Sequence, residues 1–316
     1  MPTSPMSRAA RRVGLAGKLL LALASMVGTA LALEGGARWL NLDTGFFLVP
    51  GGANCLQRSR TLSVEFRPHC IGELKDTHFG TNALGYRGTE LRDDGSVRIL
   101  AVGDSCTWGW RVGEDETYPA VLQQRLDQRY GVGRFQVLNA GVPGYTSYQV
   151  LNALREKGLP LRPAIVLIAA GFNDLFRTGD VEQQIASERR LFPLLRVDDV
   201  LLDNSRFYRW ARWRMGGSGQ AVGAVRVTPA GYARNVRDAV DAARSHGAHA
   251  MLVSFWFPLT ADQDYRLALI DAAQTVQAPL VTYDGPLIDL VHPTPEGYRL
   301  LVDDLVTALQ TEGWLS

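Results

Sequence analysis

Short apolar runs alternate with segments of helical periodicity from residue 98 to the C-terminus. Five apolar runs predict buried strands, at 99–102, 135–138, 165–170, 249–255 and 279–282. Helical spacing is found at 118–130, 148–157, 230–245 and 265–276. A last helix should begin at Pro295, because Thr294 can cap it. Strands that alternate with helices form a parallel sheet covered on both faces, so the pattern predicts an α/β domain over 91–316.

Two segments depart from this alternation. Residues 176–227 interrupt it, and we interpret them as a partly helical insertion that reaches over the sheet, since long excursions in compact domains are usually functional or mobile. Residues 34–90 are rich in Gly, Arg, Asn and Thr and have no sustained period. They are therefore expected to form a stalk and an irregular cover.

The first 33 residues differ from the rest of the chain in composition, since they combine a basic start with a long apolar run. Their basic residues are Arg8, Arg11, Arg12 and Lys18. One interpretation is a single membrane helix over 13–33, with the Lys18 side chain reaching the interface. The other is a signal peptide that is cleaved after Ala32. In both cases the basic flank stays in the cytoplasm and the rest of the chain is exported, either anchored in the inner membrane with its domain in the periplasm or outside the cell, or secreted.

The three cysteines fit an exported protein. Cys55 and Cys70 lie in the same polar segment and can either pair in an oxidising compartment or remain two free thiols. Cys106 directly follows a serine and is expected to be a small packing residue.

Composition excludes several classes of function. The net charge is +1 and no basic stripe with interleaved aromatic residues follows residue 40, so nucleic acid is not an expected partner. There is neither a Gly-x-Gly-x-x-Gly sequence after a strand nor a Walker loop, and no Cys/His spacing suits a metal. No cofactor and no metal are therefore expected.

Polar residues and glycines cluster where the predicted strands end. Ser105 follows the first strand, Gly141 the second and Asn173 the third, while Asp289 and His292 stand just before the last helix. In a parallel sheet the loops after the strands meet at one edge, which is where ligands bind. A hydroxyl, a backbone N–H, a carboxamide and an Asp/His pair are the groups that acyl transfer needs. Each residue alone also fits an ordinary turn or helix start, so the prediction depends on their joint placement.

The same residues resemble the four sequence blocks of the SGNH, or GDSL, hydrolase family. Gly-Asp-Ser at 103–105 is similar to the first block, Gly141 falls at the glycine of the second, 171–174 is similar to the third and 289–292 to the last. The resemblance covers about residues 80–312 and implies a three-layer, flavodoxin-like α/β/α domain with esterase activity and no cofactor. The membrane segment together with the Asn-x-x-Gly-Tyr-Arg stretch resembles exported bacterial members that act on envelope or exopolysaccharide sugars.

The resemblance also implies a role for each site residue. Ser105 would be the nucleophile, His292 the base and Asp289 the group that orients it, with the oxyanion held by Ser105, Gly141 and Asn173. A carboxylate partner is expected to raise the pKa of the His292 imidazole. Four aromatic residues flank these loops and are candidates for substrate contact, although they are as often core residues: Trp108, Trp110, Tyr145 and Phe172.

The expected activity is hydrolysis of carboxylic esters, O-acetyl esters above all. The expected partners are an ester-bearing small molecule or an acetylated polysaccharide, and the membrane through the N-terminal helix. Two related enzymes remain open: an acyltransferase that uses the same acyl-serine, and a lipid or short-chain carboxylesterase. A non-catalytic module that binds the envelope is a third alternative.

Overall fold

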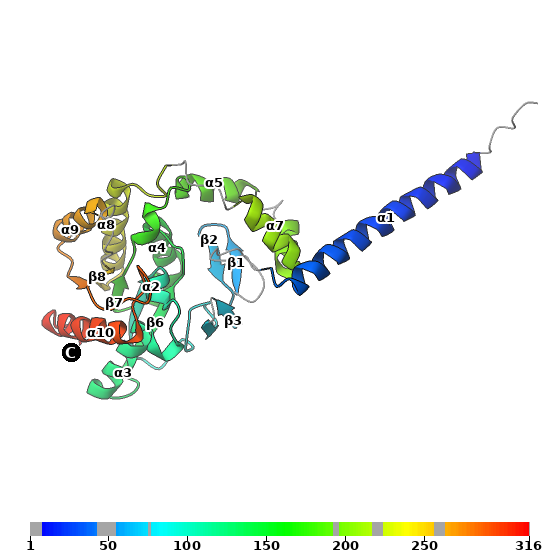
Figure 1. Ribbon diagram of the computed structural model, residues 1–316. Coiled ribbons are helices and arrows are strands. Elements are labelled where there is room, and N and C mark those ends of the chain that lie inside the picture. The colour runs from blue at the N-terminus through cyan, green and yellow to red at the C-terminus, as the bar shows by residue number, and fades with distance from the viewer. Residues whose placement is uncertain are drawn as a thin grey trace, which may run out of the picture.

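The computed structural model describes residues 8–42, 55–74, 77–191, 196–216, 224–255 and 263–315 (Figure 1). At its centre is a parallel sheet of β5 (Val97–Gly103), β6 (Phe135–Gly141), β7 (Ile165–Ile168), β8 (His249–Phe255) and β9 (Leu280–Tyr283). The strand order is β6-β5-β7-β8-β9. Numbered within the sheet this is 2-1-3-4-5, the flavodoxin-like order, whose topological switch lies between β5 and β7. The predicted α/β fold class is confirmed.

Helices cover both faces of the sheet. Alternate residues of β5 serve opposite faces: Ile99 and Ala101 belong to one core cluster, Leu100 and Val102 to the other. The first cluster is covered by α3 (Tyr118–Tyr130) and α10 (Pro295–Thr311). The second is covered by α4 (Ser147–Ala153), α8 (Pro229–Ser245) and α9 (Gln263–Thr275). Apolar residues on both faces explain why these strands appear as continuous apolar runs in the sequence.

Most element boundaries follow the predicted pattern. The Thr294 hydroxyl accepts a hydrogen bond from the Gly297 N–H and caps α10 as expected. The helix expected over 148–157 is different, because α4 ends at Ala153 and one π-helical turn, Leu154–Gly158, follows it.

The segment expected to be an irregular cover contains two small hairpins. β1 (Leu56–Ser59) pairs with β2 (Ser63–Phe66), and β3 (Ile71–Leu74) pairs with β4 (Thr77–Gly80). Strands of four residues are too short to give a readable alternation of apolar and polar positions, which is why the sequence pattern missed them.

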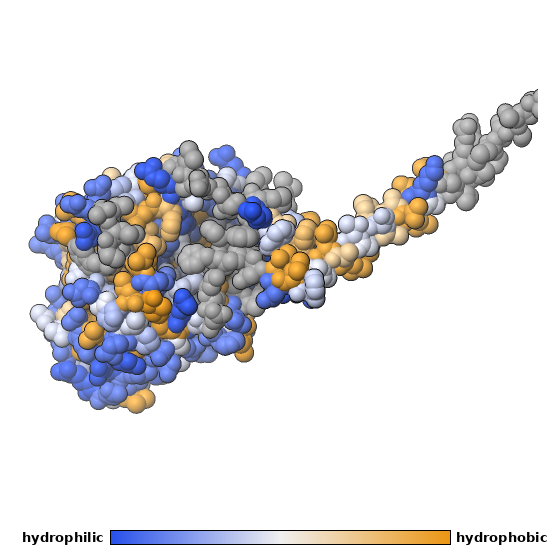
Figure 2. All heavy atoms as spheres, viewed as in Figure 1, coloured by the Kyte–Doolittle hydropathy of each residue, from blue (hydrophilic) through white to orange (hydrophobic). Residues whose placement is uncertain are grey.

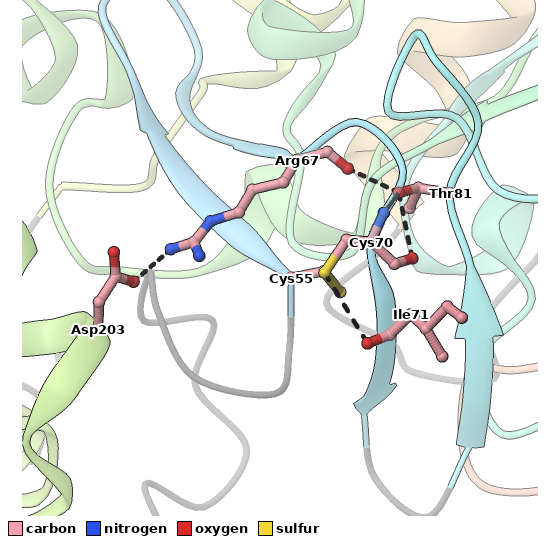
Figure 3. The surroundings of a disulfide bond; sticks show 6 residues. All are labelled: Cys55, Arg67, Cys70, Ile71, Thr81 and Asp203. Carbon is pink, nitrogen blue, oxygen red and sulfur yellow. Dashed lines mark hydrogen bonds and ion pairs between the residues drawn. A yellow bond between two sulfur atoms is a disulfide. The ribbon is translucent and has the colours of Figure 1, made fainter.

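A disulfide joins the two hairpins. Cys55 precedes β1, Cys70 precedes β3, and the two are bonded (Figure 3). The Thr81 hydroxyl beside the bond accepts from the Cys70 N–H at 2.9 Å and donates to the Arg67 carbonyl at 2.6 Å. Of the two states left open for these cysteines, the paired one is present.

The N-terminal helix stands away from the domain (Figure 1). α1 spans Arg8–Trp39 and continues past residue 33, where the first segment was expected to end. Its residues Leu15–Trp39 are long and apolar enough to cross a membrane. Together with the disulfide, this helix indicates export. The side chains of Arg8, Arg11 and Arg12 lie outside the described residues.

The insertion is largely helical where it is described. It contains α5 (Val181–Leu191), α6 (Arg196–Asn204) and α7 (Arg206–Gly216). Residues 192–195 and 217–223 of the insertion lie outside the described part of the chain. α7 packs against α1 (Figure 1).

Candidate active site

Ser105 is presented by a tight turn at the end of β5. Asp104 caps the short helix α2 (Ser105–Trp108), and its carboxylate accepts a hydrogen bond from the Cys106 N–H at 2.9 Å. Gly103 is required here, because a Cβ would lie 2.1 Å from Thr107 Oγ1 and 2.6 Å from the Ala169 carbonyl oxygen. The turn therefore places Ser105 at the carboxyl edge of the sheet, beside the topological switch.

The structure brings Ser105, His292 and Asp289 into one hydrogen-bonded chain. The Ser105 Oγ lies 2.9 Å from His292 Nε2, and His292 Nδ1 lies 2.9 Å from Asp289 Oδ2. Asp289 is itself fixed, since its Oδ1 accepts from the N–H groups of Val291 and His292 at 2.8 and 2.9 Å. A backbone bond from the Ile288 N–H to the His292 carbonyl, 2.7 Å long, closes this loop. This is the geometry of a nucleophile, a base and an orienting carboxylate.

Burial, more than the carboxylate, sets the proton affinity of His292. Desolvation lowers the pKa of the imidazole below 6.5, although the Asp289 carboxylate acts in the opposite direction. The nearby Arg111 guanidinium lowers this pKa further. The expected rise in the His292 pKa is thus corrected, because His292 is only 4% exposed and a charged imidazole loses its hydration there. For Asp289, burial would raise the pKa, but hydrogen bonds from His292 and from the backbone hold it below its ordinary value.

Asn173 lies in a short 3-10 turn, Phe172–Leu175, in the loop that follows β7 on the other side of the switch. Its amide nitrogen donates to the Tyr145 carbonyl at 3.0 Å and makes a weaker contact of 3.4 Å with Asp104 Oδ2. The carboxamide is therefore next to the turn that carries Ser105, as the order of the loops predicted.

Gly141 does not have the free N–H that was expected of it. Its N–H donates to Asn139 Oδ1 at 3.1 Å, and a Cβ at this position would lie 2.3 Å from the Trp108 backbone nitrogen. Glycine is needed here so that β6 can approach α2 closely. Three residues later, Gly144 has a φ of 83°, and no described residue accepts a hydrogen bond from its N–H. Gly144 is next to Tyr145, whose carbonyl accepts a hydrogen bond from the Asn173 amide. Of the two glycines, Gly144 is therefore the better candidate for an N–H that donates to an oxyanion.

Three of the four candidate aromatic residues belong to one buried core cluster, and two of these, Trp108 and Tyr145, face the cover segment. Trp108 is fully buried against Phe66 and Phe79, and Tyr145 is 1% exposed with its hydroxyl donating to the Val64 carbonyl at 2.6 Å. Neither can reach a substrate in this arrangement, which corrects that expectation.

The other two candidates lie closer to the chemistry. The Trp110 ring stacks on His292, with 5.6 Å between ring centroids. Phe172, next to Asn173, is partly buried and meets the half-exposed Phe176 edge to face. Trp110 thus helps to hold the base, and Phe172 stays a candidate for substrate contact.

Cys106 has no part in this chemistry. Its side chain is 1% exposed, and burial raises the pKa of its thiol well above the ordinary value, so the reactive thiolate is disfavoured. The residue is a packing residue, as expected.

Arg87 is a site-supporting residue that the sequence analysis did not single out. Its guanidinium donates to the carbonyl oxygens of Trp108, Gly109 and Val112 at 2.7 to 2.9 Å and lies 4.3 Å from the Trp108 ring centroid. It therefore fixes the end of α2. Its burial has no signal in the sequence, which shows only that Arg87 lies in the turn-rich 82–88 stretch that precedes the first strand.

No cluster of three or more His, Cys, Asp or Glu side chains suited to a metal occurs in the part of the chain that the structure describes. The arrangement around Ser105 needs only the chain's own groups to cleave an ester.

Residues 101–300 match the model of the GDSL-like lipase/acylhydrolase family. Among solved structures, the psychrotrophic esterase EstA of Pseudoalteromonas sp. is 16% identical, with 70% of this chain and 99% of that chain covered and a TM-score of 0.46. A GDSL-like lipase of Bacteroides thetaiotaomicron is 20% identical, with coverages of 68% and 89% and a TM-score of 0.42. An acetyl-xylooligosaccharide esterase of Geobacillus is 17% identical, with coverages of 69% and 96% and a TM-score of 0.46. No curated protein matches the chain.

Proposed function

Because this chain belongs to the GDSL-like lipase/acylhydrolase family of ester hydrolases, we propose that it is an exported serine esterase that removes O-acetyl groups from sugars of the cell envelope or of an exopolysaccharide. The observation that carries the proposal is the hydrogen-bonded chain Ser105–His292–Asp289. The family establishes ester hydrolysis, while the acyl group and the sugar are inferred from the site and from the N-terminal helix.

In the proposed mechanism Ser105 Oγ attacks the ester carbonyl carbon as His292 Nε2 takes the hydroxyl proton. The tetrahedral oxyanion is held by the Ser105 N–H, the Asn173 amide and the Gly144 N–H. To reach it, the Asn173 amide gives up its weaker 3.4 Å contact with Asp104. His292 then protonates the leaving sugar oxygen, and water repeats the sequence on the acyl-serine to release acetate.

Narrow access to the nucleophile supports a small acyl group. Ser105 is 8% exposed, and Trp110, stacked on His292, is 3% exposed. A long acyl chain needs an apolar channel next to the serine, whereas an acetyl group needs little more than the space of the reacting carbonyl.

The N-terminal helix supports a substrate outside the cytoplasm. We take α1 to be an uncleaved anchor, because the helix runs without a break from Arg8 to Trp39, through the alternative cleavage position after Ala32, and its residues Leu15–Trp39 are long and apolar enough to cross a membrane.

A chain-length series of 4-nitrophenyl esters, run beside acetylated sugars, tests the substrate class. We expect kcat/KM to be highest for acetyl and to fall as the acyl chain grows, with acetate released from acetylated sugars. A rate that rises toward long acyl chains would contradict the proposal and indicate a lipid esterase. Release of acetate only when a sugar acceptor is added, with the acyl group appearing on that sugar, would indicate a transferase.

The dependence of activity on pH tests the assignment of the base. His292 must be neutral to accept a proton, and its pKa lies below 6.5, so kcat/KM should hold as pH falls through 6.5 and decline only below it. Asp289→Asn should move that decline to still lower pH and reduce the plateau by roughly 10⁴-fold, because the amide neither stabilises the imidazolium nor fixes its tautomer.

Asn173→Ala is the matched control for this profile. It should lower turnover on the order of 100-fold and leave the acid limb in place, because an oxyanion donor does not titrate. An unchanged limb in Asp289→Asn would contradict the role of Asp289, and a displaced limb in Asn173→Ala would place Asn173 beside the base.

A further inference from the structure

The outer end of α1 is built into the corner between α6 and α7. The Glu34 carboxylate accepts hydrogen bonds from the Ser205 hydroxyl at 2.8 Å and from the N–H groups of Arg206 and Phe207, each at 3.1 Å. These are donors at the start of α7, so a residue of α1 caps that helix. Figure 1 shows α7 at the base of α1. The corner thus has a fixed place relative to the end of the apolar helix.

The length of α1 places this corner at the level of the lipid headgroups. Residues 13–33 of a helix rising about 1.5 Å per residue span about 30 Å, the thickness of a bilayer's hydrocarbon core. Glu34 comes directly after them. Trp39 is 84% exposed and Leu40 is 60% exposed at the same end of the helix, and tryptophan is typical of the membrane interface.

α6 carries an apolar stripe that no described residue covers. Val197, Val200 and Leu201 are 69%, 61% and 39% exposed and fall on one face at helical spacing, while Leu202 is buried on the other side. The stripe is close to α1, because the Leu201 carbonyl accepts from the Ser205 N–H at 2.8 Å and the Ser205 hydroxyl donates to Glu34. Figure 2 shows apolar residues gathered where α1 meets the rest of the molecule.

The charges around the stripe favour its contact with an anionic lipid surface. The acidic residues of α6 are neutralised from within the domain, Asp198 and Asp199 by Arg58 and Asp203 by Arg67. Two arginines of α7 also contact α6: Arg212 pairs with Asp198 at 3.3 Å, and Arg209 donates to the carbonyls of Leu202 and Asp203. The sequence of α7 has no acidic residue and is rich in arginine and aromatic residues: Arg206, Arg209, Arg212 and Arg214, with Phe207, Tyr208, Trp210 and Trp213. Arginine and aromatic side chains beside an apolar stripe are the composition of helices that lie in a membrane interface.

We propose that the α6–α7 corner is a second membrane contact, which lies in the headgroup layer of the same bilayer that α1 crosses. The stripe on α6 would enter the acyl-chain boundary, and the part of α7 that carries the exposed Arg212 and Arg214 would face the lipid phosphates. Two contacts, unlike one flexible tether, fix the orientation of the catalytic domain on the membrane. The inference rests on α1 being an uncleaved anchor, as proposed above.

The test uses the full chain in vesicles of phosphatidylethanolamine and phosphatidylglycerol. Val200→Cys is labelled with an environment-sensitive fluorophore, and Val132→Cys, 86% exposed in the turn between α3 and β6, is the matched control. The native cysteines should not react, since Cys55 and Cys70 are bonded and Cys106 is buried. The unsubstituted chain treated with the same reagent measures any background.

We expect the label at 200 to shift to the blue and to be quenched by brominated acyl chains, while the label at 132 does neither. Equal exposure of both labels to water in the vesicles would overturn the proposal. So would a blue shift at 200 that persists in detergent and resists brominated lipid, which would indicate a second copy of the chain on the stripe. Extraction of the same vesicles with carbonate tests the anchor separately. Release of the chain by carbonate would show that α1 does not anchor it. Retention of the chain together with an unquenched label at 200 would contradict only the second contact.

Discussion

Ser105→Ala will reduce kcat for ester hydrolysis by about 10⁴-fold or more, with the fold unchanged. The estimate follows from serine hydrolases, in which removing the nucleophile leaves only the contributions of the oxyanion hole and of substrate binding. Here the hydroxyl is 2.9 Å from His292 Nε2, so His292→Ala should cost about as much. Because the two residues act as a unit, the double variant should be no slower than either single variant. The measurement is kcat on 4-nitrophenyl acetate for the three variants and the parent.

Ser147→Ala is an informative control for this experiment. Ser147 is a second serine beside an acidic residue: it is 3% exposed, and its hydroxyl donates to Asp174 at 2.5 Å and accepts from the Asn235 amide at 3.0 Å. No histidine in the described part of the chain is bonded to it. We expect Ser147→Ala to keep its reaction with a fluorophosphonate probe and Ser105→Ala to lose it. Labelling that persists in Ser105→Ala would show that the nucleophile is another residue. A parent chain that neither hydrolyses esters nor reacts with the probe would revive the non-catalytic module.

The residues of the candidate site were predictable because Ser105 and Asn173 follow buried strands and because Asp289 and His292 precede a capped helix. An apolar run such as 99–102 fixes where a strand ends, and parallel strands end at one edge, so Ser105 and Asn173 had to approach each other. Asp289 and His292 were predictable through the Thr294 cap of α10, which fixes the start of the helix they precede. For these residues, position along the chain was sufficient to predict that they lie together at one edge of the sheet.

The direction in which a side chain or a backbone N–H points was not predictable in the same way. Gly141 ends β6 and Gly144 lies in the loop that follows, and only the structure shows that the Gly141 N–H donates to the Asn139 side chain. Trp108 and Trp110 are two residues apart, yet one points into the core and the other onto His292. The pKa of His292 likewise depends on how much protein surrounds the ring, and its sequence neighbour Asp289 indicates only the opposing contribution.

The cover segment was the least predictable part, because its function lies in one long-range contact. Its hairpins give no periodic signal, and Arg87 resembles any other charged residue of a loop. In the structure Arg87 is 3% exposed, and its own N–H donates to the Asn139 carbonyl on β6 at 3.2 Å. Burial lowers the pKa of its guanidinium to about 10, which leaves it charged at neutral pH. A buried charge is retained only where hydrogen bonds compensate for its lost hydration. The bonds from the two terminal nitrogens of Arg87 provide this, and they connect the cover to the end of α2, the short helix that Ser105 begins.

Arg87→Ala should therefore be damaging to stability and to activity together. The Val112 carbonyl would lose its donor, whereas the carbonyls of Trp108 and Gly109 would keep the Asn139 amide at 3.2 Å and the Val112 N–H at 3.5 Å. A buried acceptor left without a partner costs about 1–3 kcal/mol, and the contact of the guanidinium with the Trp108 ring is lost as well, so we expect the free energy of unfolding to fall by about 2–4 kcal/mol. Below the unfolding temperature, kcat should fall on the order of 100-fold, because the carbonyl of Ser105 accepts from the N–H groups of Gly109 and Trp110 at the turn that Arg87 holds.

Two further variants separate this explanation from a general effect of losing an arginine. Arg87→Lys keeps the charge but lacks the planar fork that reaches three carbonyls, so its stability and kcat should lie between those of Arg87→Ala and the parent. Arg125→Ala removes a half-exposed arginine that pairs with Asp303 at 3.1 Å on the surface, and it should change the free energy of unfolding by less than about 0.5 kcal/mol. Urea denaturation and kcat at one temperature give both quantities for each variant. An Arg87→Ala protein that matches Arg125→Ala in both would show that the nucleophile turn holds its shape without the cover, and that the cover serves some purpose other than supporting Ser105.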